Sequence, residues 1–162
     1  MDTASVTARD IMTANVISIH PEMSLFDAHE ILARNNFNGV PVINDERHVI
    51  GILTEYDMLS KASVMHLPTL QKLAGHLQGF VDKGGLSEYR KELENLKNIT
   101  VSSMMNHDPL VLSVTTPFGT IVETFYTHHR VNPIPIVDEN KILVGIISRF
   151  DVLKVFGKLD NL

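Results

Sequence analysis

The feature that most constrains the fold of this chain is an internal repeat. Residues 6–25 align with residues 99–118 at a constant offset of 93, and farther along the chain the offset becomes 94. At that offset the identical pairs are Asn38 and Asn132, Pro41 and Pro135, Gly51 and Gly145, Ile52 and Ile146, Asp57 and Asp151, and Leu59 and Leu153. A unit of about 55 residues buries little apolar surface alone, so we expect the two copies to share a core.

Composition narrows the class of protein. The chain has 162 residues, of which 44% are hydrophobic and 20% charged, enough for one compact domain or two small, joined ones. Cysteine is absent, which excludes disulfides, thiolate metal sites and cysteine nucleophiles. The net charge of −5 and the lack of any run of four basic residues argue against nucleic acid as a partner.

We also expect no membrane association. The longest apolar stretches, Ile142 to Ile147 and Val49 to Leu53, are far shorter than the roughly 20 residues of a membrane span. The N-terminus lacks the basic and apolar pattern of a signal peptide. We therefore expect a soluble, cytoplasmic protein.

Each copy carries the same order of local signals. Residues 13–19 and 110–114 are short apolar or β-branched runs that predict a strand. A helix follows, capped by Ser24 with Asp27 in its first turn in copy one, and spanning 117–129 in copy two. Two apolar strands, 40–43 and 49–53 in copy one, then form a hairpin, and helical spacing resumes at Asp57.

The stretch between the copies, residues 63–98, does not repeat. Apolar residues fall at helical spacing after Pro68, Gly84 and Gly85 end that helix, and Ser87 starts a second one. We expect an amphipathic helical insert packed on the module, with a mobile arm as the alternative.

The repeated residues resemble a known family. Gly39-Val40-Pro41-Val42-Ile43 followed by Gly51 to Asp57, and Ile134-Pro135-Ile136-Val137 followed by Gly145 to Asp151, are similar to paired cystathionine beta-synthase (CBS) domains, the Bateman module. The resemblance covers repeat 1 at 6–62 and repeat 2 at 99–157. It implies an α+β fold, similar to an α/β sandwich. Two tandem β-α-β-β-α units would be related by pseudo-two-fold symmetry, with two clefts that each accept an adenosine compound.

The chemistry of such a ligand points to two carboxylates. A carboxylate accepts hydrogen bonds from both ribose hydroxyls, and charge-assisted bonds of this kind are strong. We therefore expect Asp57 and Asp151 to bind ribose. The alternative is that each is simply a helix N-cap, and both roles are compatible.

The resemblance implies further ligand contacts around these carboxylates. Thr54 and Ser148 place hydroxyls at a strand-to-helix junction, where a helix N-terminus favours an anion, with hydroxyl capping alone as the alternative. Ile17 and Val111 would line the base, and Gly39 would let the main chain approach its edge. Pro133 replaces that glycine in copy two and puts the second base pocket in doubt. The full predicted set is Thr13, Val16, Ile17, Asn38, Gly39, Val40, Pro41, Thr54, Asp57, Asn106, Leu110, Val111, Asn132, Pro133, Ile134, Pro135, Ser148, Arg149 and Asp151.

The two copies differ in charge next to these positions. Glu55 follows Thr54, whereas Arg149 follows Ser148, and Arg130 and Lys154 are also in copy two. If these side chains face the clefts, copy one repels phosphate and copy two attracts it.

No pattern of a metal site or an active site stands out. The eight histidines include no His-x-x-x-His or Glu-x-x-His pair, so we expect no metal. Asp57 and Asp151 are repeat mates, which suits two binding sites better than an acid and a base. We therefore expect no enzyme and no catalytic cofactor. The hypothesis is a ligand-sensing regulatory module, a homodimer that signals to an unknown protein, and the alternative is a constitutive dimerisation scaffold without a ligand.

Overall fold

The computed structural model describes residues 5–64 and 98–159. The first unit consists of α2 (Leu25–Asn35), the hairpin of β1 (Gly39–Ile43) and β2 (Val49–Thr54), and α3 (Glu55–Val64). Helix α2 begins where the sequence predicts, because the Ser24 hydroxyl accepts a hydrogen bond from the Asp27 amide at 3.1 Å. The insert expected at 63–98 lies outside the described residues except at its ends.

The second unit repeats this arrangement. It consists of the short β3 (Leu112–Ser113), α7 (Phe118–Thr127), the strands β4 (Ile134–Val137) and β5 (Leu143–Ile147), and α8 (Arg149–Leu159). The two hairpins share one register, since Pro41 lies opposite Ile52 and Pro135 lies opposite Ile146. The α+β fold with two tandem units is confirmed.

The strand predicted at residues 13–19 is not formed. Thr13 bridges to Ile146 of the second unit, whereas Ile19 bridges to Val42 of the first. The segment thus crosses from one unit to the other within seven residues, so it cannot form a continuous ladder with either hairpin. Its counterpart at 110–114 is also shorter than predicted, with β3 at Leu112–Ser113.

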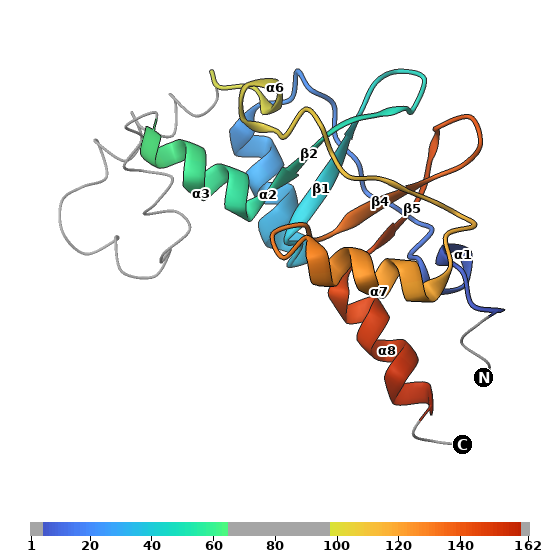
Figure 1. Ribbon diagram of the computed structural model, residues 1–162. Helices are drawn as coiled ribbons and strands as arrows, with labels where there is room; N and C mark the ends of the chain where they lie inside the picture. The colour runs from blue at the N-terminus through green and yellow to red at the C-terminus, as the bar shows by residue number, and fades with distance from the viewer. Residues whose placement is uncertain (1–4, 65–97, 160–162) are drawn as a thin grey trace.

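The segment that precedes each unit packs on the other unit. Helix α1 (Ala8–Ile11) contacts β5 and α8, and helix α6 (Val101–Met104) contacts α2 and α3. Figure 1 shows α1 beside the second unit and α6 beside the first, at opposite ends of the molecule. This exchange ties the two units together, because each completes the core of its neighbour.

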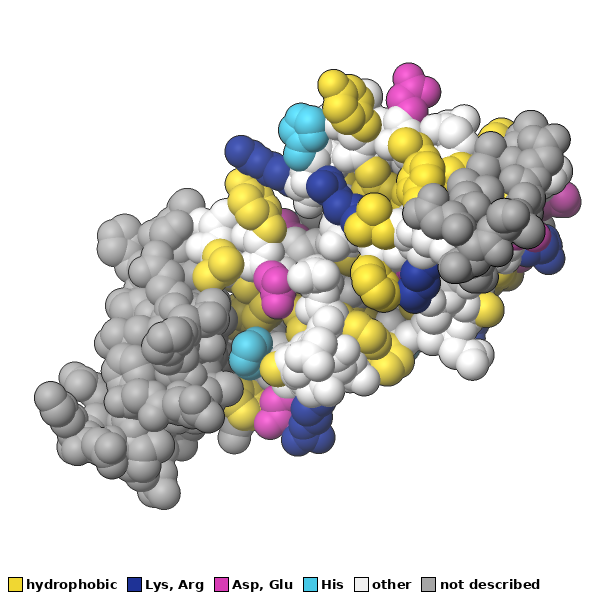
Figure 2. Space-filling model, turned by 90° about the horizontal axis from the view of Figure 1, so that it is seen from below, with side chains coloured by type: hydrophobic (Ala, Val, Ile, Leu, Met, Phe, Trp, Pro, Cys, Tyr) yellow, Lys and Arg dark blue, Asp and Glu magenta, His cyan; other side chains and the backbone are white. Residues whose placement is uncertain are grey.

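Large hydrophobic side chains stay exposed at equivalent places on the last helix of each unit. Tyr56 and Leu59 on α3 are 48% and 42% exposed, and their repeat counterparts Phe150 and Leu153 on α8 are 66% and 62% exposed. Figure 2 shows the molecule from below, where hydrophobic side chains lie on the visible face among polar and charged ones. Exposed hydrophobic side chains therefore recur at two equivalent positions on α3 and α8.

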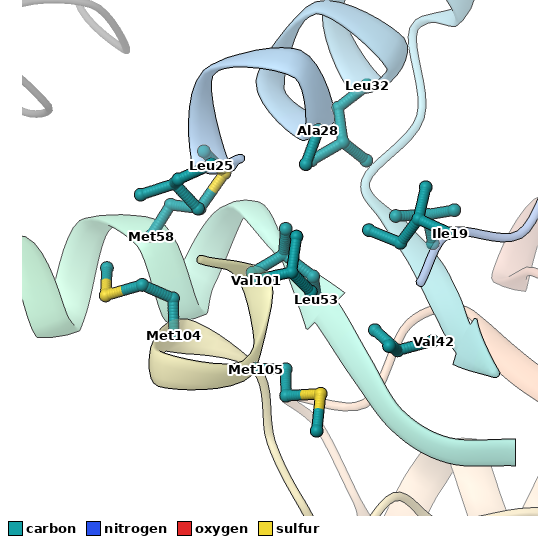
Figure 3. Packing of buried hydrophobic residues seen from close by; sticks show 11 residues of the cluster. Ile19, Leu25, Ala28, Leu32, Val42, Leu53, Met58, Val101, Met104 and Met105 are labelled. Atoms are coloured by element: carbon teal, nitrogen blue, oxygen red, sulfur yellow. The ribbon is translucent and has the colours of Figure 1, made fainter. Parts of the chain in front are cut away.

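Two hydrophobic cores lie under these helices, one for each unit. In the first core, Leu25 from α2, Leu53 from β2 and Met58 from α3 meet Val101 and Met104 from α6 (Figure 3). The second core is built in the same way around Ile121 and Ile134, with Val6 and Ala8 from the N-terminal segment. Four further apolar residues of α2 and α7 pack on these cores: Phe26, Ile31, Val122 and Phe125.

A glycine in each hairpin makes room for the exchanged segment. A Cβ on Gly51 would lie 2.5 Å from Met105 Sδ and 3.0 Å from the Asn106 carbonyl oxygen. A Cβ on Gly145 would collide with Met12 in the same way. The glycine at this repeated position is therefore explained by the close approach of the neighbouring segment.

We expect Gly51→Ala to lower the free energy of unfolding by about 1–3 kcal/mol, because overpacking displaces Met105 and the backbone at Asn106. The matched control is Gly119→Ala in α7, where nothing lies within 4 Å of the added methyl group. That control should raise stability by about 0.5–1 kcal/mol, since alanine favours a helix. Chemical denaturation measures both variants, and an equal response would contradict the assigned contact.

Candidate functional site

A cavity of about 390 Å³ opens between the two units. Its first-unit wall is formed by the crossing segment with Thr13 and Ile17 and by the loop that leads from α2 to Gly39. Its second-unit wall is formed by the end of β5 and the start of α8, with Ser148 and Asp151. The volume falls in the range of small-molecule sites, about 300–1,000 Å³. We call this site the Asp151 cavity.

The Asp151 carboxylate is held by the start of α8. Its Oδ2 accepts hydrogen bonds from the Ser148 amide at 2.9 Å and from the Ser148 hydroxyl at 2.6 Å. The Ser148 hydroxyl in turn accepts from the Asp151 amide at 3.3 Å. This reciprocal arrangement is a capping box in which Ser148 is the cap and Asp151 the third helical residue, so the aspartate is not itself the N-cap.

A lysine shares the same carboxylate. Lys154 Nζ lies 3.0 Å from Asp151 Oδ1, and both residues line the cavity. Burial of Asp151 raises its pKa, but the hydrogen bonds from Ser148 and the ammonium of Lys154 outweigh burial and lower that pKa below its ordinary value. Asp151 is therefore an ionised acceptor at neutral pH, although it is 9% exposed.

Nearly half of the residues predicted for ligand contact line the Asp151 cavity. They come from both copies: Thr13, Val16, Ile17, Asn38, Gly39, Asn132, Pro133, Ser148 and Asp151. From the repeat alone, Thr13, Ile17 and Gly39 would share a pocket with Asp57, which belongs to the same copy. In the structure they line one cavity with Asp151, which belongs to the other copy. The reason is the crossing of residues 13–19, which brings Thr13 to the last strand of the second unit.

Gly39 and Pro133 meet at this cavity instead of serving separate pockets. A Cβ on Gly39 would lie 2.9 Å from Pro133 Cδ, so the two repeat positions face each other. Asn38 and Asn132, one residue before each, are joined by a hydrogen bond of 3.4 Å. Both repeat loops therefore meet at this contact between the units.

The symmetry-related carboxylate lies in an equivalent local setting. Asp57 Oδ2 accepts from the Thr54 amide at 3.0 Å and from the Thr54 hydroxyl at 2.5 Å. Asn106 exchanges two backbone hydrogen bonds with Ile52, as Thr13 does with Ile146. The predicted residue Asn106 thus pairs with the unit that carries Thr54 and Asp57. Leu110 instead packs against the core of the second unit, and Val111 is 38% exposed. We call Thr54, Asp57 and Asn106 the Asp57 set.

The strand residues in the predicted set have mainly structural positions. Val40 and Ile134 are fully buried and belong to the two cores, so their side chains do not face the cavity. Pro41 and Pro135 are buried in the middle of the hairpins. Their contact with a ligand stays a prediction.

The charge asymmetry predicted from Glu55 and Arg149 takes a different form. The Arg149 guanidinium donates hydrogen bonds to the carbonyl oxygens of Phe125, His128 and His129 at the end of α7, and Arg149 is not among the described residues that line the cavity. Glu55 accepts a hydrogen bond from Asn38 at 3.3 Å. One terminal nitrogen of the Arg149 guanidinium makes all three of its hydrogen bonds to carbonyl oxygens. Among the described residues that line the cavity, Lys154 is the cation.

Six further lining residues were not in the predicted set: Asn15, Asn36, Phe37, Ile146, Phe150 and Lys154. Asn36 ends α2 in the left-handed conformation with φ 52°, which asparagine tolerates. Phe150 and Lys154 face the cavity because they follow Ser148 on α8. The sequence Ser-x-Phe-Asp-x-x-Lys places Phe150 and Lys154 on α8 close to Asp151. Their position at the cavity could therefore be predicted only after the orientation of α8 toward the cavity was known.

Comparison with known proteins decides the family. The family model described as the CBS domain matches residues 8–63 and again residues 101–158. The chain belongs to the CBS-domain family. The tandem pair inferred from the repeat is confirmed, and the match covers both units of the structure.

Relatives of this CBS pair include proteins of different overall size. The CBS domain-containing protein CBSX2, chloroplastic, from Arabidopsis thaliana is 27% identical over 91% of this chain and 62% of its own length. A homoserine O-acetyltransferase from Methanosalsum zhilinae is 22% identical over 94% of this chain but 24% of its own length. The chain therefore spans less than two thirds of each of these two relatives.

Solved structures agree with the fold. CBSX2 in complex with AMP has a TM-score of 0.69 and 23% identity, covering 95% of this chain and 98% of that one. The CBS domain pair of protein MJ0100, in complex with 5′-methylthioadenosine and S-adenosyl-L-methionine, has a TM-score of 0.67 and 20% identity, covering 95% and 98%. At these identities the structures establish a shared fold.

Within residues 5–64 and 98–159, no three histidine or acidic side chains gather in a way that could hold a metal ion. In the same part of the chain, no helix is long and apolar enough to cross a bilayer. The chemistry of the Asp151 cavity thus rests on the Asp151 carboxylate and the Lys154 ammonium.

Proposed function

We propose that this CBS pair is a regulatory module that binds adenosine-containing ligands between its two units. The observation that carries the proposal is the Asp151 cavity, where an ionised carboxylate faces a hollow of about 390 Å³ together with Ile17 and Gly39. The carboxylate suits a ribose diol, the apolar side chain suits a base, and glycine admits close backbone approach. The bound AMP, methylthioadenosine and S-adenosylmethionine of the neighbouring structures support this ligand class.

The same cavity suggests how binding is transmitted. Its walls come from both units, and Asn38 and Asn132 join the two units at the cavity. A ligand that contacts both walls favours one relative orientation of the units by its differential affinity for that orientation. We propose that a partner protein responds to this change.

Calorimetry with AMP, ADP, ATP, NAD and S-adenosylmethionine tests the ligand class. We expect saturable binding of at least one of these compounds, and loss of that binding when both Asp57 and Asp151 are replaced by alanine. If none of them binds the folded protein, the regulatory proposal fails and a constitutive scaffold is favoured. The capping boxes of both aspartates favour that alternative, because they give each carboxylate a structural role without a ligand.

We also propose that the module is a homodimer. The exposed Tyr56, Leu59, Phe150 and Leu153 occupy repeat-related positions on α3 and α8, so each unit offers the same apolar positions. Repeated apolar positions of this kind suit the self-complementary contact of a two-fold dimer. A monomer at micromolar concentration in sedimentation velocity would contradict this assembly.

A non-enzymatic role and a cytoplasmic location belong to the same proposal. The two carboxylates serve equivalent helix starts and so do not form a differentiated acid and base pair. The cysteine-free sequence suits a reducing compartment. Incubation with the same nucleotides should leave them chemically unchanged, and any turnover would contradict the role.

A further inference from the structure

The carboxylate proposed to bind ribose is already engaged on both of its oxygens. Asp151 Oδ2 accepts the two hydrogen bonds from Ser148, and Oδ1 lies 3.0 Å from Lys154 Nζ. Ribose hydroxyls that bind Oδ1 therefore compete with the ammonium. Lys154 thus occupies the Asp151 oxygen that a ribose hydroxyl would need.

The competition between ribose and Lys154 affects ligand affinity, because few charged groups line the cavity. Among the described residues that line it, Asp151 and Lys154 are the charged ones, and they form one neutral pair. The Asp151 side chain is 11% exposed, whereas that of Lys154 is 55% exposed, so the lysine is the partner free to move. A displaced ammonium keeps the Phe150 ring nearby, 4.8 Å from its centroid, but no second carboxylate lines the described wall.

The effect of displacing Lys154 on ligand affinity depends on the charge of the ligand. A phosphate-bearing ligand takes the Asp151 oxygen with its ribose and offers its own oxygens to the released ammonium, so one charged pair replaces another. An uncharged adenosyl compound releases the ammonium without replacing its partner. A ligand with a positive charge adds repulsion to that loss.

We propose that Lys154 makes the Asp151 cavity selective for adenosyl ligands that carry an anionic group, phosphate above all, over uncharged ones. This selectivity rests on the proposed function, because it requires that an adenosyl ligand binds Asp151. Lys154 is a specificity-determining residue in this account, and it acts both by holding the carboxylate and by receiving the anion.

No lysine or arginine in residues 5–64 or 98–159 forms an ion pair with Asp57, so within this part of the chain the Asp57 set has no counterpart of Lys154. Ser60 stands at the repeat position of Lys154, and the nearby Lys61 donates its ammonium hydrogen bonds to the carbonyl oxygens of Met104 and Met105 at 2.9 and 2.8 Å. Asp57 Oδ1 accepts no hydrogen bond from residues 5–64 or 98–159. Arg130 lies 5.2 Å from the ring centroid of Tyr56, the residue before Asp57. The two carboxylates therefore differ in how freely they receive an uncharged nucleoside.

The test compares AMP and adenosine by calorimetry in an Asp57→Ala background, so that the Asp151 cavity is observed alone. We expect Lys154→Met to weaken AMP about tenfold and to tighten adenosine about twofold to fivefold, because an anion partner and a competing ammonium are lost together. The preference for AMP over adenosine should thus fall about twentyfold to fiftyfold. Lys154→Arg should retain the preference, since it keeps the charge.

Lys141→Met is the matched control, because it removes an exposed lysine of the second unit that does not line the cavity. It should leave both affinities unchanged. An AMP preference that Lys154→Met does not alter, or adenosine weakened as much as AMP, would overturn the role of Lys154 while leaving the adenosyl site intact. Absence of binding by both compounds in the folded Asp57→Ala protein would overturn the site itself, and the selectivity with it.

Discussion

Replacing Asp151 by alanine is expected to abolish AMP binding in the Asp151 cavity. Charge-assisted hydrogen bonds to the ribose hydroxyls are lost, at a cost of about 1.5–3 kcal/mol or more in binding free energy. The free energy of unfolding should fall less, by about 1 kcal/mol, because the capping box with Ser148 is also removed. Calorimetry and chemical denaturation of the same variant separate the two effects.

Asp27 provides a matched control for the structural part of this effect. Its carboxylate accepts from the Ser24 hydroxyl at 2.6 Å and its amide donates to the same hydroxyl at 3.1 Å, but it does not line the cavity. Asp27→Ala should therefore lower stability by about the same 1 kcal/mol and leave AMP affinity unchanged. If Asp151→Ala binds AMP as tightly as Asp27→Ala does, Asp151 is a helix-capping residue and no more.

The second large effect concerns the exchange of segments between the units. Met104 belongs to the second repeat by sequence, yet its side chain is fully buried in the core of the first unit. We expect Met104→Ala to lower the free energy of unfolding by about 2–5 kcal/mol, through lost burial and the cavity it leaves. Hydrogen exchange should show the loss of protection in β1 and β2.

Ser103 is the control for this substitution, since it is exposed and adjacent on the same short helix. Ser103→Ala should change stability by no more than about 0.5 kcal/mol. If Met104→Ala instead leaves the amides of β1 and β2 protected from exchange and reduces protection in β4 and β5, then α6 packs on its own unit. That result would contradict the exchange and the composition of the cavity that follows from it.

The elements of each unit were predictable because their signals are local. Ser24 caps α2 as the sequence indicates, and the alternating apolar runs around Pro41 and Pro135 form the hairpins. These features depend on side chains within a few residues of one another. The tandem pair followed from the repeat itself.

The pairing of site residues across the units was not predictable in the same way. An alignment of repeats shows which positions are equivalent, but it does not show on which unit residues 6–12 pack. Thr13 therefore was grouped with Asp57, although its backbone pairs with Ile146. Arg149 was expected near phosphate, but three carbonyl oxygens at the end of α7 attract its guanidinium. Both outcomes depend on contacts far apart in sequence.

The sequence also does not distinguish buried from exposed apolar residues on the helices. Phe26 and Phe125 have a helical spacing that fits either a core or a partner surface, and in the structure both pack on the cores. Tyr56 and Phe150 follow the strand ends, where spacing does not distinguish a cavity wall from an interface. Their exposure depends on the angle at which α3 and α8 leave the sheets.

A crystal structure of the protein with AMP would show whether the ligand binds between the two units at Asp151. We expect adenine against Ile17 and Gly39, and ribose hydroxyls within hydrogen-bond distance of the Asp151 carboxylate. We also expect that Lys154 Nζ has left Asp151 Oδ1 for a phosphate oxygen. AMP bound away from both Asp151 and Asp57, or bound at Asp151 through its phosphate with the ribose in solvent, would contradict the account.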